Sequence, residues 1–399
     1  MDILPAMSED RPQRDEITAK AASTLAKALP TLEKQHAFVG FDGFIDVIMR
    51  VVDRRRTMVY EDYEPIRTIE AFAKRAATAA GRSANMELVT LERRFGGNGP
   101  LLAGALGRLG LSANYVGAVG CQDDHCRLDP LFEPFAQRCT SVTPIAPPCM
   151  TEACEFEDGK LMFGHSANAS QITWERIKQV VGLDRLREMI DDASLIGMVN
   201  WTIVGGLEGI WRGLCDEVFP QLSDRRRRIF IDLSDPAKRT DSDLGRGLGL
   251  ISEMSTAIPV TLGLNLAESQ RIALVLGVEP AHSGETPGTG GEVTRAAAAI
   301  RASLGIDRVV IHRRDGAGAS EKSDHAAWFD GPFTRNPLLS TGAGDHFNAG
   351  FAAAEQIGLG LEECLAMACA TSGLYVREGQ SPTGARVASF LEALPTPER

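Results

Sequence analysis

Between residues 195 and 311 the chain repeats one pattern, in which short apolar runs alternate with longer segments of helical periodicity. Short apolar runs bounded by loops predict buried strands, and the segments between them predict helices. Strands that alternate with helices in this way are typical of a parallel sheet covered by helices on both faces. The predicted strands are residues 195–200, 229–233, 261–264 and 308–311.

The first half of the chain predicts a second, smaller sheet beside the main one. A helix at 15–29 leads into a short buried strand at 37–40, which ends in glycine. Residues 151–163 alternate on both sides of a Glu-Asp-Gly-Lys turn, a pattern that predicts a β-hairpin. We therefore expect one α/β domain over residues 1–399, with a helical insertion at 60–81 and a small separate sheet. The strands of this small sheet, which the resemblance described below implies to be a lid, are expected at about 47–56, 87–95 and 150–165.

Charge and composition narrow the classes of function. The formal net charge is −11, which argues against nucleic-acid binding because phosphate backbones are bound by clustered cations. No apolar run approaches the ~20 residues that span a bilayer, and the polar start, 1–14, does not look like a signal peptide. We therefore expect a cytoplasmic protein with no membrane partner, in which the eight cysteines are reduced thiols.

The stretch from Ser340 to Gly350 carries the strongest chemical pattern. Gly342, Ala343 and Gly344 can expose several backbone N–H groups, and the apolar run that follows predicts a helix. A helix N-terminus with free amides binds anionic oxygen. Asp345 places a carboxylate beside that anion pocket, which suits a base that takes a proton from a hydroxyl during phosphoryl transfer. The alternative is that Asp345 only caps the helix.

Two carboxylates and a second glycine loop are expected at the sheet edge. Asp42 and Asp46 follow the first strand, and ligands of open α/β sheets bind beyond such strand ends. An ionised carboxylate accepts two hydroxyl hydrogen bonds, so the pair suits a polyhydroxylated ligand. Gly97 and Asn98 lie between a predicted strand and a predicted helix, which brings them to the same crevice. The alternative for the two aspartates is simple turn formation.

These motifs together resemble the ribokinase-like, or PfkB, family of sugar and nucleoside kinases. The resemblance implies that Asp345 is the catalytic base, that the 342–344 amides stabilise the transferring phosphoryl group, and that Asp46 binds acceptor hydroxyls. It also implies ATP as the donor and a lid that often forms a homodimer interface. The position where most relatives carry Thr-Leu-Gly has His312 instead, which leaves ATP and ADP both open as donors.

The donor side is expected from the second half of the chain. Asn265 and Glu268 resemble the family's Asn-x-x-Glu element, in which the glutamate acts on Mg²⁺ through water. Magnesium keeps several waters and favours oxygen ligands, although Glu268 could equally be a helix cap. Thr341 and Gly318 complete the predicted nucleotide contacts.

The remaining functional alternatives differ in class. The chain has no Gly-x-x-x-x-Gly-Lys-[Ser/Thr] motif and no Gly-x-Gly-x-x-Gly after the first strand, which disfavours P-loop NTPases and dinucleotide oxidoreductases. We predict an ATP-dependent phosphotransferase acting on a sugar-like hydroxyl. A nucleoside kinase of the same fold and a non-catalytic sugar- or nucleotide-binding regulator remain as alternatives, and the sequence does not name the acceptor.

Overall fold

The protein is built around a nine-stranded sheet, seen in a computed structural model that describes residues 11–281 and 290–398. The strand order is β14-β13-β12-β11-β10-β9-β1-β5-β6, and all neighbours are parallel except the pairs β12/β13 and β13/β14. Its strands are β1 (His36–Phe41), β5 (Ser112–Gly117), β6 (Ser141–Pro144), β9 (Leu195–Val199), β10 (Arg228–Asp232), β11 (Val260–Asn265), β12 (Arg308–His312), β13 (Gly316–Glu321) and β14 (Ala326–Asp330). The prediction of a mostly parallel sheet is confirmed.

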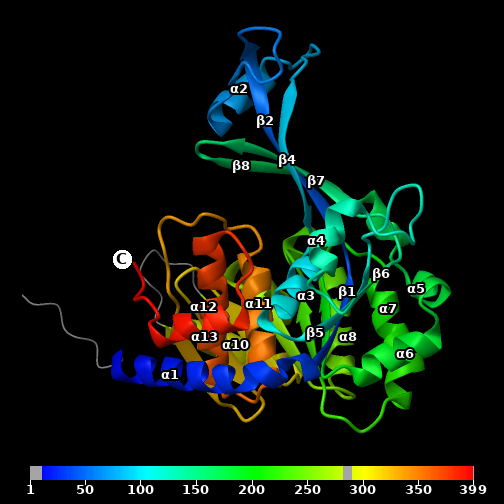
Figure 1. The fold of residues 1–399 in the computed structure, drawn as a ribbon, viewed down its shortest axis with the longest axis vertical. Helices are drawn as coiled ribbons and strands as arrows, with labels where there is room; N and C mark the ends of the chain where they lie inside the picture. Colours follow the sequence, from blue (N-terminus) through cyan, green and yellow to red (C-terminus); the bar gives the residue numbers. More distant parts are fainter. Residues whose placement is uncertain (1–10, 282–289, 399) are drawn as a thin grey trace, which may run out of the picture.

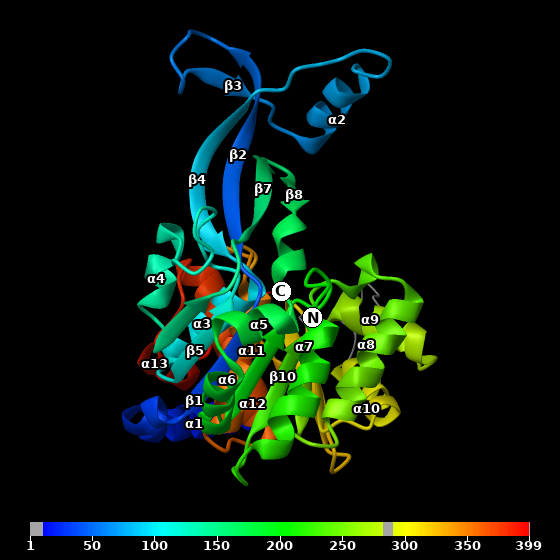
Figure 2. The same ribbon diagram turned by 90° about the vertical axis from the view of Figure 1, so that its right-hand side faces the viewer.

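Helices cover both faces of this sheet because its strands are apolar on both sides. In β1, Val39 packs into one core and Phe38 into the other, as expected for side chains that alternate along a strand. One face carries α1 (Arg11–Ala28), α3 (Asn98–Leu109), α11 (Ala343–Gln356), α12 (Leu361–Glu378) and α13 (Gly384–Glu392). The other carries α5 (Trp174–Val180), α6 (Leu183–Asp192), α7 (Leu207–Gly213), α8 (Asp241–Met254), α9 (Leu266–Leu276) and α10 (Gly290–Leu304). Figure 2 shows α3 and α13 on one side of the strands and α8, α9 and α10 on the other.

A second sheet projects from the main body (Figures 1 and 2). It contains β2 (Phe44–Arg55), β3 (Tyr63–Pro65), β4 (Leu88–Gly96), β7 (Cys149–Phe156) and β8 (Gly159–His165). Strand β2 is central, since it pairs with β3, β4 and β7. These strands lie where the sequence predicted the small sheet, and its closure over the site as a lid stays a prediction.

The predicted helical insertion at 60–81 is only partly helical. The structure has a short helix, α2 (Ile69–Ala77), preceded by strand β3 and by turns. Pro65 explains the difference, because proline disfavours helix at the residue before it. The polar start of the chain, 1–14, lies largely outside the described residues.

The described helices include none that is both long enough and apolar enough to cross a bilayer.

Candidate active site

The two predicted glycine loops meet at one point. Asn98 opens α3 and Asp345 lies in the first turn of α11, and the Asn98 Nδ2 donates a hydrogen bond of 2.9 Å to Asp345 Oδ1. Gly342 takes a left-handed conformation, φ 89°, at the start of α11, and no described side chain caps that helix. The Ala343 amide donates a 3.2 Å hydrogen bond to the Ser340 carbonyl, while the Gly342 and Gly344 amides have no backbone partner among the described residues and can meet an anion beside the Asp345 carboxylate.

Asp345 is buried, with 8% of its surface exposed. Burial raises the pKa of its carboxyl well above the ordinary value, and the nearby Asp232 carboxylate raises it further, while the Asn98 hydrogen bond opposes both. A carboxylate held in such an environment takes up a proton readily. The arrangement suits a general base. A cation bound with the phosphate donor would favour the ionised carboxylate of Asp345 before the acceptor arrives.

Asp42 is anchored by the protein itself. Its carboxylate accepts hydrogen bonds from the Gly99 amide at 2.7 Å, the Asn98 amide at 3.0 Å and the Asn200 side chain at 2.7 Å. The side chain is 1% exposed, and burial raises its pKa to about 6. These contacts favour an anchoring role, in which Asp42 holds the second glycine loop, over the direct acceptor contact that the sequence predicted.

Asp46 is placed differently from Asp42, although only four residues separate them. None of the described residues donates a hydrogen bond to its carboxylate, which lies against Gly96, where an added Cβ would come within 2.7 Å of Oδ2. Burial raises the pKa of Asp46, and the Arg94 and Lys160 charges lower it. Its oxygens therefore remain free to accept hydrogen bonds from a ligand, as predicted for an acceptor contact. Gly97, with φ 100°, turns the chain between Gly96, which packs against Asp46, and Asn98 at the start of α3.

A cavity of about 1040 Å³ lies on the other side of the α11 N-terminus, where the sequence predicted the donor side. Asn265, His312, Ala343 and Gly344 line it, together with residues of α12. Its volume is at the upper end of the range for small-molecule sites. His312 is neutral there, because burial lowers its pKa to about 4.

Two predicted donor contacts need correction or refinement. Gly318 lies inside β13, packed against Val293 and Trp328, so it does not line the cavity, and Gly316 does so instead. The reason is that β13 begins at Gly316, directly after the turn that follows His312, so only the first residue of this strand reaches the opening of the cavity. Thr341 precedes the amides that were predicted to bind an anion, and its hydroxyl accepts a hydrogen bond from Lys160.

Glu268 lies at the start of α9 and is nearly buried. It forms a capping box with Asn265, whose amide donates to Oε2 at 2.8 Å, and it also accepts the Asp235 amide at 2.9 Å. Burial and the neighbouring Asp232 carboxylate raise its pKa to about 7. No group of three His, Cys, Asp or Glu side chains with the geometry of a direct metal site occurs in the described part of the chain. The carboxylates of Glu268 and Asp232 repel each other, and this fits a hydrated divalent cation, which would relieve the repulsion through bound water.

Three residues of the site escaped the sequence reasoning. Asn200 follows β9 with φ 65°, donates to Asp42, and leaves its own Oδ1 buried without a hydrogen-bond partner among the described atoms. Asp232 ends β10 and accepts a 2.6 Å hydrogen bond from Asn348. Both could have been found as polar residues at strand ends. Lys160 had no such signal, because it lies in a hairpin of the other sheet, 181 residues before Thr341 in the sequence.

His346 supports the catalytic loop from behind. Its ring stacks on Tyr375 at 3.6 Å between centroids, and its nitrogens lie 2.7 Å from the Gly342 carbonyl and 2.8 Å from the Ser381 hydroxyl. Both ring nitrogens are thus occupied within the protein, so His346 shapes the loop that carries Asp345.

Comparisons with known proteins agree with this geometry. The profile of the prokaryotic ketohexokinase family matches residues 14–394. A ketohexokinase of Haloferax volcanii is 32% identical over 381 residues, which cover 94% of this chain and 96% of that protein. The ribokinase of Arabidopsis thaliana, solved with ribose and ATP, superposes with a TM-score of 0.59 at 17% identity, over 90% of this chain and 98% of its own. The ribokinase of Cryptococcus neoformans var. grubii, solved with ADP, gives 0.61 at 14% identity, over 89% and 99%. The chain therefore belongs to the prokaryotic ketohexokinase family, with a ribokinase fold, and is an ATP-dependent carbohydrate kinase that transfers a phosphoryl group to a sugar hydroxyl.

Proposed function

We propose that the acceptor is a ketohexose and that Asp345 is the base that takes the proton of its reacting hydroxyl. The observation that carries this proposal is the Asn98–Asp345 hydrogen bond, which joins the acceptor loop to the anion-binding loop. The identity of the acceptor rests on the ketohexokinase relative.

In this mechanism the free Asp46 carboxylate accepts hydrogen bonds from sugar hydroxyls, while Asn98 positions both the acceptor and Asp345. The hydroxyl oxygen attacks the γ-phosphorus as its proton passes to Asp345, and the bond from that phosphorus to the β–γ bridging oxygen breaks. The amides of Gly342, Ala343 and Gly344 stabilise charge on the transferring oxygens. ATP occupies the 1040 Å³ cavity in this arrangement.

We further propose that Glu268 holds Mg²⁺ through water beside the donor phosphates. When bound, the ion neutralises phosphate charge and shields the buried acids from one another. The raised pKa of Glu268 supports a cation there, because a carboxylate that repels its neighbours gains most from one.

We also propose a homodimer formed through the small sheet. Three apolar side chains are exposed there: Leu91 on β4 at 46%, and Met162 and Phe163 on β8 at 55% and 46%. Light scattering of the wild type and of Phe163→Asp would test the dimer, since an interface at this sheet requires the variant to dissociate.

We propose a cytoplasmic location as well. The eight unpaired cysteines support it, because thiols stay reduced in that compartment.

The acceptor is tested with the purified protein by coupling ADP release to a colour change. Ketohexoses, aldohexoses, ribose and nucleosides are each offered with ATP, with and without Mg²⁺, and products are identified by NMR. We expect the highest kcat/KM with a ketohexose and loss of activity when Mg²⁺ is removed. Preferential turnover of a nucleoside, or sugar binding without turnover, would overturn the proposal.

A further inference from the structure

The small sheet touches the catalytic loop through one side chain. The Lys160 Nζ, at the start of β8, donates a 3.0 Å hydrogen bond to the Thr341 hydroxyl, which lies 181 residues away in the sequence. Within 11–281 and 290–398 this is the one hydrogen bond between the small sheet and residues 340–345. Figure 1 shows why it can form, since the β7–β8 hairpin reaches out over the end of α11 and α12.

The position of Lys160 matters because the site is rich in negative charge. The buried Asp232 and Asp42 lie close enough to Asp345 to raise its pKa, and Asp46 lies on the same mouth. The phosphates of the bound donor add further negative charge to the charge of these carboxylates. Lys160 and Arg94, both carried by the small sheet, are the charges that lower the pKa of Asp46. The small sheet therefore brings two positive charges to the mouth of this acidic site.

The loop that Lys160 contacts is the one expected to hold the transferring group. Thr341 is followed directly by the amides at 342–344, and α11 begins at Ala343. The lysine stem is flexible, and its three donors can turn from the Thr341 hydroxyl to a phosphoryl oxygen bound at these amides.

We propose that Lys160 is a catalytic residue, which the small sheet delivers to the non-bridging oxygens of the transferring phosphoryl group. The proposal rests on the proposed function of the same site. Lys160 moves no proton in this step: the proton passes from the acceptor hydroxyl to Asp345, the new bond joins the acceptor oxygen to phosphorus, and ADP leaves. The ammonium stabilises the charge that spreads over the oxygens as the bonds exchange.

The insertion at the far end of the small sheet fixes the turn that precedes Lys160. Asp158 accepts a 2.9 Å hydrogen bond from the Ile69 amide at the start of α2, and Phe72 packs on Phe156 with ring centroids 5.6 Å apart. Gly159 has φ 153°, a conformation that other residues rarely adopt, and an added Cβ would lie 3.1 Å from the end of the Ile69 side chain, which would have to move.

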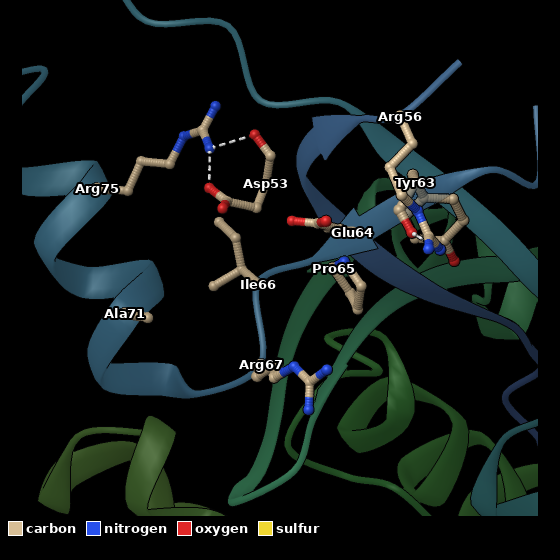
Figure 3. A pocket seen from close by; sticks show the side chains of 9 residues that line it. All are labelled: Asp53, Arg56, Tyr63, Glu64, Pro65, Ile66, Arg67, Ala71 and Arg75. Atoms are coloured by element: carbon tan, nitrogen blue, oxygen red, sulfur yellow. Dashed lines mark hydrogen bonds and ion pairs between the residues drawn. The ribbon is translucent and has the colours of Figure 1, made fainter. Parts of the chain in front are cut away.

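The insertion is itself held together by paired charges. Figure 3 shows Arg75 reaching both the carboxylate and the backbone carbonyl of Asp53, at 2.6 and 2.7 Å, across a hollow of about 490 Å³. The turn at 157–159 thus rests on an ordered support, which limits where Lys160 can point.

The decisive experiment compares Lys160→Met with Lys160→Arg, using whichever sugar the wild type phosphorylates. Loss of one donor to a developing oxyanion costs about 10²- to 10³-fold in kcat, and we expect that loss for Lys160→Met, with the sugar KM within threefold of the wild type. Lys160→Arg, which restores the charge, should recover at least tenfold. The affinity for ADP with aluminium fluoride should fall in Lys160→Met while ATP binding is kept, since only the former mimics the transition state.

Two controls separate this role from a structural one. Lys322→Met removes an exposed lysine in the β13–β14 turn and should leave kcat unchanged. Thr341→Val breaks the hydrogen bond but keeps the ammonium, so it should cost less than Lys160→Met. The proposal is overturned if Lys160→Met, folded by its thermal melt, keeps kcat within threefold, or if Thr341→Val costs as much. Failure of the wild type with every ketohexose would instead count against the proposed acceptor and leave the Lys160 comparison valid with the sugar it does use.

Discussion

Replacing Asp345 with asparagine removes the proposed base with little change in shape. The carboxamide oxygen can still accept the Asn98 hydrogen bond, which is 2.9 Å long in the wild type, so the contact between the two loops is kept. The proton of the attacking hydroxyl, however, has no acceptor. A lost general base lowers kcat by about 10²- to 10⁴-fold, or about 3–5 kcal/mol of transition-state stabilisation.

The same substitution should stabilise the fold. The pKa of Asp345 is raised in the folded protein, so the folded state binds the proton more tightly than the unfolded state does. In the pH range between the two pKa values stability falls as pH rises, and above the folded pKa the ionised group costs about 1.4 kcal/mol for each unit of the shift. Asp345→Asn carries no charge and avoids that cost, so its melting temperature at neutral pH should exceed that of the wild type.

The assay combines steady-state kinetics with thermal unfolding. We expect kcat to fall with the KM for ATP and sugar nearly unchanged, while the melting temperature rises. Asp232→Asn is the comparison, because it removes a neighbouring buried charge and leaves the base; its stability should also rise, and kcat should fall less than in Asp345→Asn, since Asp232 acts only through the proposed magnesium site. Full turnover by Asp345→Asn, or equal losses in the two variants, would refute the assignment of the base.

Three further predictions concern the acceptor, the loop and the pH profile. Asp46→Ala should raise the sugar KM by about tenfold to 100-fold, since hydrogen bonds to a charged group contribute about 1.5–3 kcal/mol, with the ATP KM unchanged in the same titrations; a weaker ATP affinity would contradict the assignment. Gly342→Ala should lower both the melting temperature and kcat, because its φ of 89° costs an L-residue about 1–2 kcal/mol and the new Cβ would lie 2.9 Å from the Tyr375 hydroxyl. Gly358→Ala, with φ 75° and open space around the Cβ, isolates the backbone cost and should leave kcat alone. In a pH profile of kcat/KM, activity should be lost as pH falls through the raised pKa of Asp345, well above the ~3.9 of an ordinary aspartate, and an acid limb at the ordinary value would count against a buried base.

The sequence predicted the strands of the sheet and the two glycine loops because each is encoded within a few neighbouring residues, and the role of Asp345 as the base stays a prediction. It could not separate the roles of Asp42 and Asp46, since both follow the same strand and only the packing of Asn98, Gly99 and Asn200 around Asp42 distinguishes them. The choice between Gly316 and Gly318 depended on where β13 begins, which shifts by a residue or two without any change in pattern.

Lys160 illustrates a different limit of sequence reasoning. Its contact with Thr341 depends on the bend of a whole sheet over the main body, and no local periodicity reports that bend. The insertion was similarly overestimated as a helix, because its alanine-rich part, 71–80, has high helix propensity while the part before it pairs with β2.

Because the central strand of the small sheet is long, a small rotation at its base moves its outer end through a large distance. Strand β2 has 12 residues, which correspond to a length of about 40 Å, and its outer end carries the insertion. A tilt of about 10° at the base would sweep that end through about 7 Å. If the small sheet closes over the site as predicted, a dye attached at the exposed Met58, beyond the end of β2, would show that closure as a large displacement that single-molecule fluorescence can follow during turnover.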